Sequence, residues 1–310
     1  MTTTVGIAGI TGKFARLLVK KLLEYPDLKI KGYCRNVAKV PLSLQSDSRV
    51  ETVQGDAGDG ARLADFVTGC DVVACCYLGG DDLMLDGQKA LIDACEAAHV
   101  SRYIAGDWCL DYTKLELGQL FPKDPMIHIK SYLESKKHVK GVHILVGGFM
   151  DPQFSPFFGV LDASTTTFRY WGDGTEIWEG TSYENAAEYT AAIATNKDAA
   201  GVQRVIGGRA SFLEITDIFG KVYNVTPKLE KLGSLDDLYK HMHELRAQSP
   251  AEWYKYMPLF FTYYWLNGQT YVGPEIDNSR YPQVKPQTWE DFMKARTMEQ
   301  LTQAYASLSV

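Results

Sequence analysis

The sequence predicts an α/β fold in which a Rossmann-type parallel sheet with helices on both faces is joined to a smaller, mainly helical C-terminal domain. Two observations in the first 150 residues predict the sheet. Short β-branched runs alternate with helical patterns of about 10–15 residues, and several runs are almost continuously apolar, as in strands covered on both faces. The expected strands occupy residues 4–8, 29–33, 50–54, 72–76, 102–105 and 142–146. The expected helices occupy residues 13–24, 61–66, 87–98 and 127–139.

The pattern changes after residue 150, where aromatic, glycine-rich and proline-rich segments appear and further helical stretches follow. We therefore expect a first domain at residues 1–150 and a second at residues 151–310. One strand near residues 202–207 is expected to return to the first sheet, so the two domains are not cleanly separate.

Two features of the second domain predict helices. Ser211 and Ser249 each precede a glutamate by three residues, which is typical of a capping box at a helix start. Residues 253–265 are dense in aromatic side chains. We expect them to form a buried helix or a contact between subunits, which leaves a homodimer open.

Composition and charge exclude several classes of function. The chain has 310 residues, of which 45% are hydrophobic, and a net charge of -6, which argues against nucleic acid as its main partner. No apolar run reaches the roughly 20 residues that span a bilayer, and the first residues lack the features of a signal peptide. We therefore expect a cytoplasmic location and no membrane partner. The six cysteines and six histidines show no metal-ligand spacing, so we predict reduced, packed cysteines and no metal.

A glycine-containing loop follows the first predicted strand directly. It reads Gly9-Ile-Thr11-Gly12-Lys13-Phe14-Ala15 and opens the first predicted helix. The first glycine permits a tight turn, the second lets a pyrophosphate approach the backbone, and the alanine lets the helix pack close to the strand. Free N–H groups and the helix dipole then favour an anion. We expect residues 9 and 11–14 to bind a dinucleotide; the alternative, a purely structural turn, explains the flanking strand and helix less well.

The second predicted strand ends at Arg35, and Lys39 follows shortly after. NAD-selective sites usually carry a carboxylate here, which accepts hydrogen bonds from the ribose. Arg35 instead offers a planar cation suited to a 2′-phosphate, and Lys13 could add a second charge. The alternative is a solvated arginine on a loop. We expect NADP(H) as the cofactor.

Further short motifs follow this loop along the chain. They are Gln54-Gly-Asp56-Ala57, Gly69-Cys-Asp71-Val-Val, Gly106-Asp107-Trp108, Gly147-Gly-Phe149, Thr181-Ser-Tyr183-Glu184-Asn-Ala-Ala-Glu-Tyr189 and Ile206-Gly-Gly208. Together with the loop, Arg35 and a helix containing Lys130, they resemble the NmrA-like and isoflavone-reductase-like branch of the atypical short-chain dehydrogenases. The resemblance is strongest before residue 150 and is closest to fungal-type members, some of which act in small-molecule biosynthesis.

The resemblance implies further cofactor contacts. Asp56 and Ala57 would lie beside the adenine. Tyr77 and Leu78 would lie beside the pyrophosphate and the nicotinamide ribose. Phe149 would help to form the pocket near the nicotinamide.

The resemblance also bears on catalysis. Short-chain dehydrogenases use Tyr-x-x-x-Lys, and the family spacing to Gly141 selects Lys130 as the lysine, with Met126 in place of the tyrosine. Isoflavone-reductase-like enzymes instead use the lysine as general acid and base, and a desolvated lysine can do this. Lys130 is therefore the expected catalytic residue and also a cofactor contact, although it could hold only the cofactor ribose.

A second Tyr-x-x-x-Lys lies on the same predicted helix, from Tyr132 to Lys136. Tyr132 is two residues beyond Lys130, about 200° round the helix, so the two side chains cannot both face the nicotinamide. We prefer Lys130, and we expect His128 to be non-catalytic.

The function implied by the resemblance is an NADPH-dependent reductase of a small apolar molecule, aromatic or an enone or ketone, in secondary-metabolite biosynthesis. The expected substrate pocket comprises Trp108, Phe149, Phe154 and Phe158, although these aromatics could equally be core. Two alternatives remain open: an NADP(H)-binding sensor or regulator without catalysis, and a redox-neutral isomerase or cyclase on the same fold.

Overall fold

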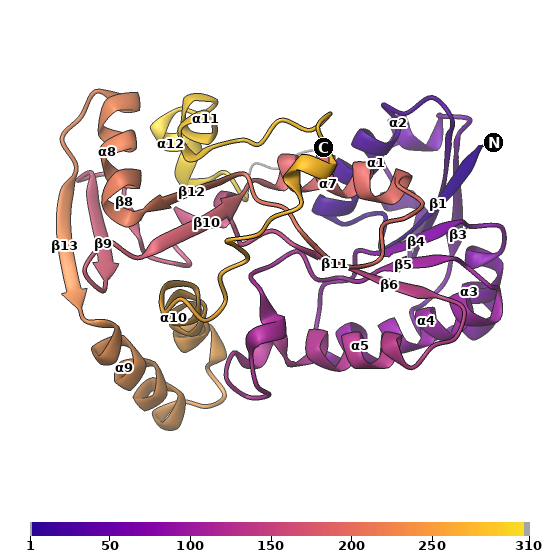
Figure 1. Cartoon of the computed structure of the whole chain (residues 1–310), viewed down its shortest axis with the longest axis horizontal. Coiled ribbons are helices and arrows are strands. Elements are labelled where there is room, and N and C mark those ends of the chain that lie inside the picture. The colour runs from indigo at the N-terminus through magenta and orange to yellow at the C-terminus, as the bar shows by residue number, and fades with distance from the viewer. Residues whose placement is uncertain (1, 307–310) are drawn as a thin grey trace.

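A parallel sheet forms the centre of the N-terminal part (Figure 1). The computed structural model describes residues 2–306, and within them this sheet has seven strands in the order β11-β6-β5-β4-β1-β2-β3, all neighbours parallel. Their bounds are β1 Thr3–Ala8, β2 Leu28–Cys34, β3 Val50–Gln54, β4 Val72–Cys75, β5 Arg102–Ile104, β6 Lys140–Leu145 and β11 Gly201–Arg204. The predicted fold class is confirmed. Because the strand order reverses beside β1, the carboxyl ends of β1, β2 and β4 border a crevice suited to a ligand.

Helices cover both faces of this sheet (Figure 1). Helices α1 (Lys13–Leu22) and α7 (Tyr183–Thr195) share one hydrophobic core on one face. Helices α3 (Gly60–Val67), α4 (Gln88–Ala97) and α5 (Asp124–Glu134) pack on the other. The inner side of α7 is rich in alanine, so this helix approaches α1 and the sheet closely. Strand β11 and helix α7 both come from beyond residue 150, so the later part of the chain completes the first sheet and its cover.

The C-terminal part contains two small sheets as well as helices. The sheets have the orders β12-β10-β7 and β13-β9-β8. Their strands are β7 Gly148–Phe149, β8 Leu161–Asp162, β9 Thr167–Trp171, β10 Ile177–Thr181, β12 Gly208–Ser211 and β13 Lys228–Gly233. The larger helices are α8 Phe212–Tyr223, α9 Leu235–Gln248, α10 Trp253–Leu266, α11 Trp289–Lys294 and α12 Met298–Thr302. The sequence did not predict these sheets, because their strands are short and lack a sustained period of two.

Short helical segments occupy the connections. They are α2 Leu42–Gln45, α6 Met150–Gln153, η1 Val37–Lys39, the π-helical η2 Asp82–Gly87, η3 Tyr112–Lys114, η4 Phe121–Lys123 and η5 Asn278–Arg280. The predicted capping box at Ser211 is confirmed at the start of α8. The one at Ser249 is wrong: α10 begins at Trp253, and its N-cap Glu252 makes no side-chain cap.

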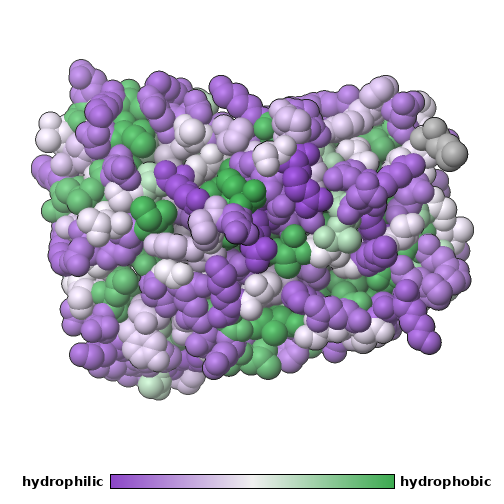
Figure 2. Space-filling model, in the orientation of Figure 1, coloured by the Kyte–Doolittle hydropathy of each residue, from purple (hydrophilic) through white to green (hydrophobic). Residues whose placement is uncertain are grey.

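Helix α10 is only half buried. Its inner face contributes Tyr256, Phe260 and Trp265 to the core of the C-terminal part, whereas Trp253 and Tyr254 are 52% and 54% exposed. On the face in view in Figure 2, apolar residues form small patches among polar ones. The homodimer stays a prediction.

Two further findings concern the described residues. No helix in residues 2–306 has the length and apolar character that crossing a membrane requires. In the same residues, no group of three or more histidine, cysteine, aspartate or glutamate side chains is placed to hold a metal ion. All six cysteines are free thiols, and five of them are buried.

Candidate cofactor and active site

The loop between β1 and α1 has the geometry of an anion-binding turn. Gly9 has a φ of +80°, and a Cβ there would lie 2.9 Å from the Cys76 carbonyl oxygen, so a side chain is excluded both by conformation and by space. The N-cap Gly12 makes no side-chain cap, and the first turn of α1 carries no acidic residue. Because the amide of Arg16 makes the first helical bond, to the Gly12 carbonyl, the three N–H groups before it have no partner within the helix. They are available to a phosphate.

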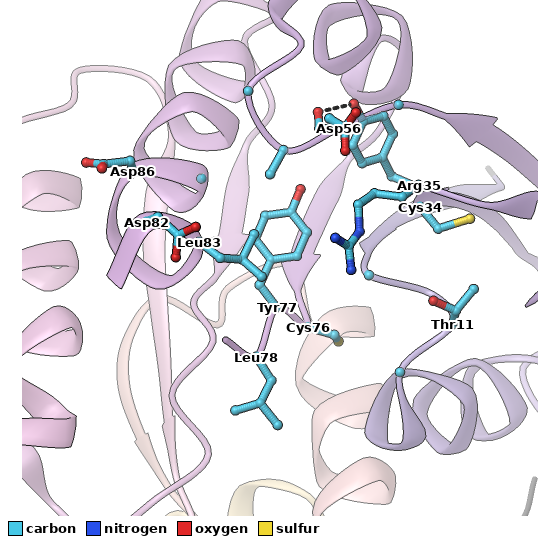
Figure 3. A pocket seen from close by; sticks show the side chains of 17 residues that line it. Thr11, Cys34, Arg35, Asp56, Cys76, Tyr77, Leu78, Asp82, Leu83 and Asp86 are labelled. Atoms are coloured by element: carbon cyan, nitrogen blue, oxygen red, sulfur yellow. Dashed lines mark hydrogen bonds between the residues drawn. The ribbon is translucent and has the colours of Figure 1, made fainter. Parts of the chain in front are cut away.

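A cavity of about 590 Å³ opens at this loop. Most of the predicted cofactor residues line it: Gly9, Thr11, Gly12, Arg35, Asp56, Ala57, Tyr77 and Leu78. Lys13, Phe14, Lys130 and Phe149 are not part of its lining. Figure 3 shows the Arg35 side chain extending into the cavity toward Tyr77, with Asp56 at the far end and Leu78 pointing away. The structure thus brings together the residues predicted for the adenosine and pyrophosphate.

A second, smaller cavity lies beside the first at the end of β2. Its volume is about 360 Å³, and its lining consists of Thr11, Arg35, Asn36 and Lys39. Two cations and no carboxylate therefore surround it. The Asn36 side chain accepts a hydrogen bond from the Ala38 amide at 3.0 Å and holds the backbone turn between the two cations. This lining suits a phosphate monoester.

The far end of the large cavity is held by a buried tyrosine. The Tyr33 hydroxyl donates a hydrogen bond to the Asp56 carbonyl oxygen at 2.7 Å and fixes the turn after β3. Burial, followed by the nearby Asp59 and Asp56 carboxylates, raises the pKa of Tyr33 to about 12, so the hydroxyl keeps its proton at neutral pH. A Cβ at Gly55 would lie 2.2 Å from this hydroxyl, so only glycine fits.

Tyr77 forms one wall of the cavity and carries an unpaired polar atom. Its hydroxyl is buried and has no hydrogen-bond partner among the residues that the structure describes, and burial raises the pKa of this phenol. Its ring lies against Gly9 and Gly87, where added Cβ atoms would approach it to 3.4 and 3.7 Å. An orphan hydroxyl, free helix N–H groups and a cationic side cavity together fit a phosphorylated dinucleotide.

Four aromatic side chains gather where β5 and β6 end; we call Phe14, Trp108, Phe149 and Tyr183 the aromatic cluster. The ring centres of Phe14 and Trp108 are 4.5 Å apart, and those of Phe149 and Tyr183 are stacked at 4.0 Å and 8°. Trp108 has a φ of +29°, an uncommon conformation for a residue with a side chain. Its indole N–H donates to the Thr190 hydroxyl at 2.8 Å, which holds the ring in place.

The other predicted substrate residues lie elsewhere. Phe154 is fully buried and packs edge-on against Phe168 and Trp289 in the core of the C-terminal part. Phe158 packs against the same core. The structure therefore brings Trp108 and Phe149 together but keeps Phe154 and Phe158 in a separate cluster.

Comparison with known proteins identifies the first part of the chain. Residues 9–142 match the family model described as NAD(P)H-binding. This part of the chain is therefore similar in sequence to NAD(P)H-binding domains. A short match covers 73 residues at 33% identity, 23% of this chain and 28% of the protein "Oxidoreductase GME11367" from Pestalotiopsis microspora.

Solved structures extend the likeness in fold to nearly the whole chain. AtPrR2 with NADP+ and (+)-pinoresinol has a TM-score of 0.80 and 18% identity over 95% of this chain and 99% of that one. An isoflavone reductase has a TM-score of 0.73 and 17% identity over 95% and 99%. Leucoanthocyanidin reductase from Vitis vinifera, solved with NADPH, has a TM-score of 0.73 and 15% identity over 94% and 98%. The fold implied by the resemblance is confirmed; the fungal-type assignment stays a prediction.

The predicted proton donors lie on α5, and neither Lys130 nor Tyr132 lines the cofactor cavity. The Lys130 ammonium pairs with Glu134 one turn further along, and its side chain is 28% exposed. It is thus paired and partly solvated, unlike the desolvated lysine that we expected for a general acid. Tyr132 donates to the Asp93 carboxylate at 2.8 Å on the neighbouring α4, and His128 is exposed. The catalytic role of Lys130 stays a prediction.

Several residues of the cofactor cavity were not predicted. Cys76 and the η2 residues Asp82, Leu83 and Gly87 supply one wall. No sequence signal pointed to this wall, because a π-helical turn has no characteristic spacing of apolar residues. Lys39 did carry a signal, since it lies four residues after Arg35 in a cationic turn.

Proposed function

We propose that this chain is an NADPH-dependent reductase of a small apolar molecule, aromatic or an enone or ketone, acting in secondary-metabolite biosynthesis. The observation that carries the choice of cofactor is the cavity lined by Arg35, Asn36 and Lys39. A dinucleotide with its pyrophosphate on the loop and its adenine beside Asp56 would place a 2′-phosphate there. An NAD-selective site would have a carboxylate in this place.

In this proposal, each group of residues has a separate role. The free N–H groups at the start of α1 hold the pyrophosphate, and Arg35 with Lys39 holds the 2′-phosphate. Trp108 and Phe149 supply an apolar surface that keeps water from the reacting carbon. Bound NADPH supplies the hydride. The proton comes from Lys130 or from a bound water.

The first experiment is a fluorescence titration with NADPH and NADH. It is followed by incubation with aromatic enones and ketones while absorbance at the nicotinamide band is monitored. We expect tighter binding of NADPH and its consumption with at least one compound. If neither NADPH nor NADH binds, the proposal is wrong. If NADPH binds but none of the compounds causes it to be oxidised, the result favours the alternatives below.

The role of Lys130 is tested with a matched pair of variants. Lys130→Ala removes the ammonium paired with Glu134, and Lys136→Ala removes the ammonium paired with Asp93 on the same helix. If Lys130 donates the proton, only the first variant loses kcat, and its NADPH affinity stays near that of the wild type. Equal kcat values in both variants assign the proton to water.

One observation favours a second function, a non-catalytic NADP(H) sensor. Both candidate donors are engaged, Lys130 by Glu134 and Tyr132 by Asp93. A sensor would bind NADPH, consume none of it, and tolerate Lys130→Ala. A redox-neutral isomerase or cyclase would convert a compound without oxidising the cofactor.

A further inference from the structure

The last described residues of the chain return to the phosphate loop. Helix α12 ends at Thr302, and the residues after it lie over the start of α1. The Lys13 ammonium donates hydrogen bonds to the carbonyl oxygens of Tyr305 at 2.9 Å and Ala306 at 3.3 Å. It also lies 4.7 Å from the centre of the Tyr305 ring. The first residue of α1 is thus tied to a segment 292 residues away.

Tyr305 extends the aromatic cluster toward the surface. Its ring centre is 5.8 Å from that of Tyr183, which stacks on Phe149, and Phe149 lies 6.2 Å from Phe14. Tyr305 is 37% exposed, so it forms the outer layer over rings that are more deeply buried. The segment therefore covers the cluster and the start of α1 together.

The cofactor cavity does not extend beneath this cover. Its lining reaches Tyr77 and Leu78 but includes neither Lys13 nor any member of the aromatic cluster. The residues predicted for the adenosine and pyrophosphate therefore line an open cavity, whereas Phe149, which we predicted beside the nicotinamide, lies outside it in the aromatic cluster. A nicotinamide placed beside Phe149 would therefore compete for space with the aromatic cluster and with Tyr305.

The positive charge of Lys13 indicates which kind of ligand would displace Tyr305 and Ala306. Lys13 is bonded to two neutral carbonyl oxygens. A pyrophosphate on the adjacent N–H groups of α1 would bring negative charge close to the same ammonium, and hydrogen bonds between charged partners are stronger than those to a neutral acceptor. A bound dinucleotide therefore competes with the segment for Lys13.

We propose that Tyr305 and Ala306 form a plug over the nicotinamide half of the site, and that a whole dinucleotide displaces this plug whereas an adenosine nucleotide does not. The proposal rests on the proposed function only in taking NADP(H) as the ligand. Because the plug and the dinucleotide exclude each other, removal of the plug must tighten dinucleotide binding by the free energy of the lost contacts. Because both hydrogen bonds are exposed to solvent, we count them and the ring contact together as one ordinary net hydrogen bond, which corresponds to about a tenfold change in Kd.

The test compares two ligands on four proteins. The ligands are NADPH and adenosine 2′,5′-bisphosphate, which fills only the open half. The proteins are the wild type, Tyr305→Ala, a chain that ends at Ala304, and the control Tyr254→Ala, which changes an exposed tyrosine on α10. We expect the Kd for NADPH to fall about tenfold in the chain that ends at Ala304. The fall should be smaller in Tyr305→Ala, which loses the ring but keeps the two backbone carbonyl oxygens, and absent in the control. The Kd for the bisphosphate should be the same in all four.

An unchanged ratio of the two Kd values in the plug variants overturns the plug. So does weaker NADPH binding, which is the result expected of a strap that closes over bound cofactor. If the wild type binds neither ligand, the proposed function fails, and this result is distinct from the failure of the plug alone.

A second measurement needs no variant. Chymotrypsin cleaves after tyrosine, and cleavage after Tyr305 releases the peptide 306–310, which mass spectrometry detects. We expect NADPH to accelerate release of this peptide relative to the ligand-free protein, and the bisphosphate to leave the rate unchanged. Protection of the peptide by NADPH overturns the proposal.

Discussion

Replacement of Arg35 by alanine removes one of the two cations that line the smaller cavity. Arg35 and Lys39 are both exposed, so their attraction to a phosphate is weakened by water. Two unit charges 4 Å apart in water attract each other by about 1 kcal/mol, so a phosphate with nearly two negative charges gains about 2 kcal/mol from Arg35. The loss predicted for Arg35→Ala is therefore about 30-fold in NADPH affinity. NADH lacks the phosphate and should bind almost as before.

The assay is a fluorescence titration of NADPH and NADH with Arg35→Ala, Lys39→Ala and Lys29→Ala. Lys29 is an exposed cation near the opposite end of the same strand β2 and serves as the control for net charge. The ratio of NADPH to NADH affinity should fall in the first two variants only, and the fall should be smaller at high salt because salt screens exposed charges. Equal losses for both cofactors, or equal changes in the control, would refute the assignment of this cavity to the 2′-phosphate.

Three further predictions concern the scaffold around the site. Gly9→Ala forces a side chain into a left-handed position against the Cys76 carbonyl. It should weaken NADPH binding by about 1–2 kcal/mol, or about 5- to 30-fold; titration measures the loss, and wild-type affinity would contradict it. Arg102 is buried and donates hydrogen bonds to three carbonyl oxygens at the end of α7. Arg102→Met should therefore lower the free energy of unfolding, measured in urea, by about 3 kcal/mol. A loss below about 1 kcal/mol would show that these carbonyl oxygens accept hydrogen bonds from other donors. Backbone N–H groups, first that of Val139, lower the pKa of Glu96 from 4.5 to about 2. The stability that Glu96 contributes is complete above pH 4.5 and is lost as the pH falls toward 2. In Glu96→Gln, the free energy of unfolding should therefore fall less between pH 4.5 and pH 2 than in the wild type. An unchanged pH dependence of the free energy of unfolding would contradict this.

The central sheet was predictable because its strands carry a strong local signal. Residues 50–54 form the predicted strand without a shift, and β1 begins one residue before the predicted start. Each such run is short, apolar and bounded by turn residues, so burial on both faces leaves little freedom in its placement. The boundary at Ser249 failed because the capping pattern is local, whereas the start of α10 depends on where its aromatic face meets the core of the C-terminal part.

The gathering of Gly9 and Arg35 at one cavity was predictable from the sequence, whereas the surroundings of Lys130 were not, for a related reason. The position of Gly9 is set by the backbone turn in which it lies, and that of Arg35 by the end of the strand before it. Both the turn and the strand end are determined by residues nearby in the sequence. The direction of Lys130 around α5 follows from helix geometry, but its partner Glu134 decides where the ammonium rests. That pair has the spacing of four residues at which opposite charges meet on a helix, so the signal was present in the sequence. The approach of Tyr305 to Lys13 has no local signal, because it joins opposite ends of the chain.

The return of β11 to the first sheet has a consequence for how the chain folds during synthesis. When residue 150 leaves the ribosome, β6 still lacks its outer neighbour, and α1 lacks the alanine-rich surface of α7. The apolar groove beside α1 and one edge of the sheet remain open until residue 204 has emerged. A fragment that ends at residue 150 would expose both, and an unpaired sheet edge invites pairing with another chain. The two parts are therefore expected to unfold in one cooperative transition, and the nascent N-terminal part depends on later segments for its protection from aggregation.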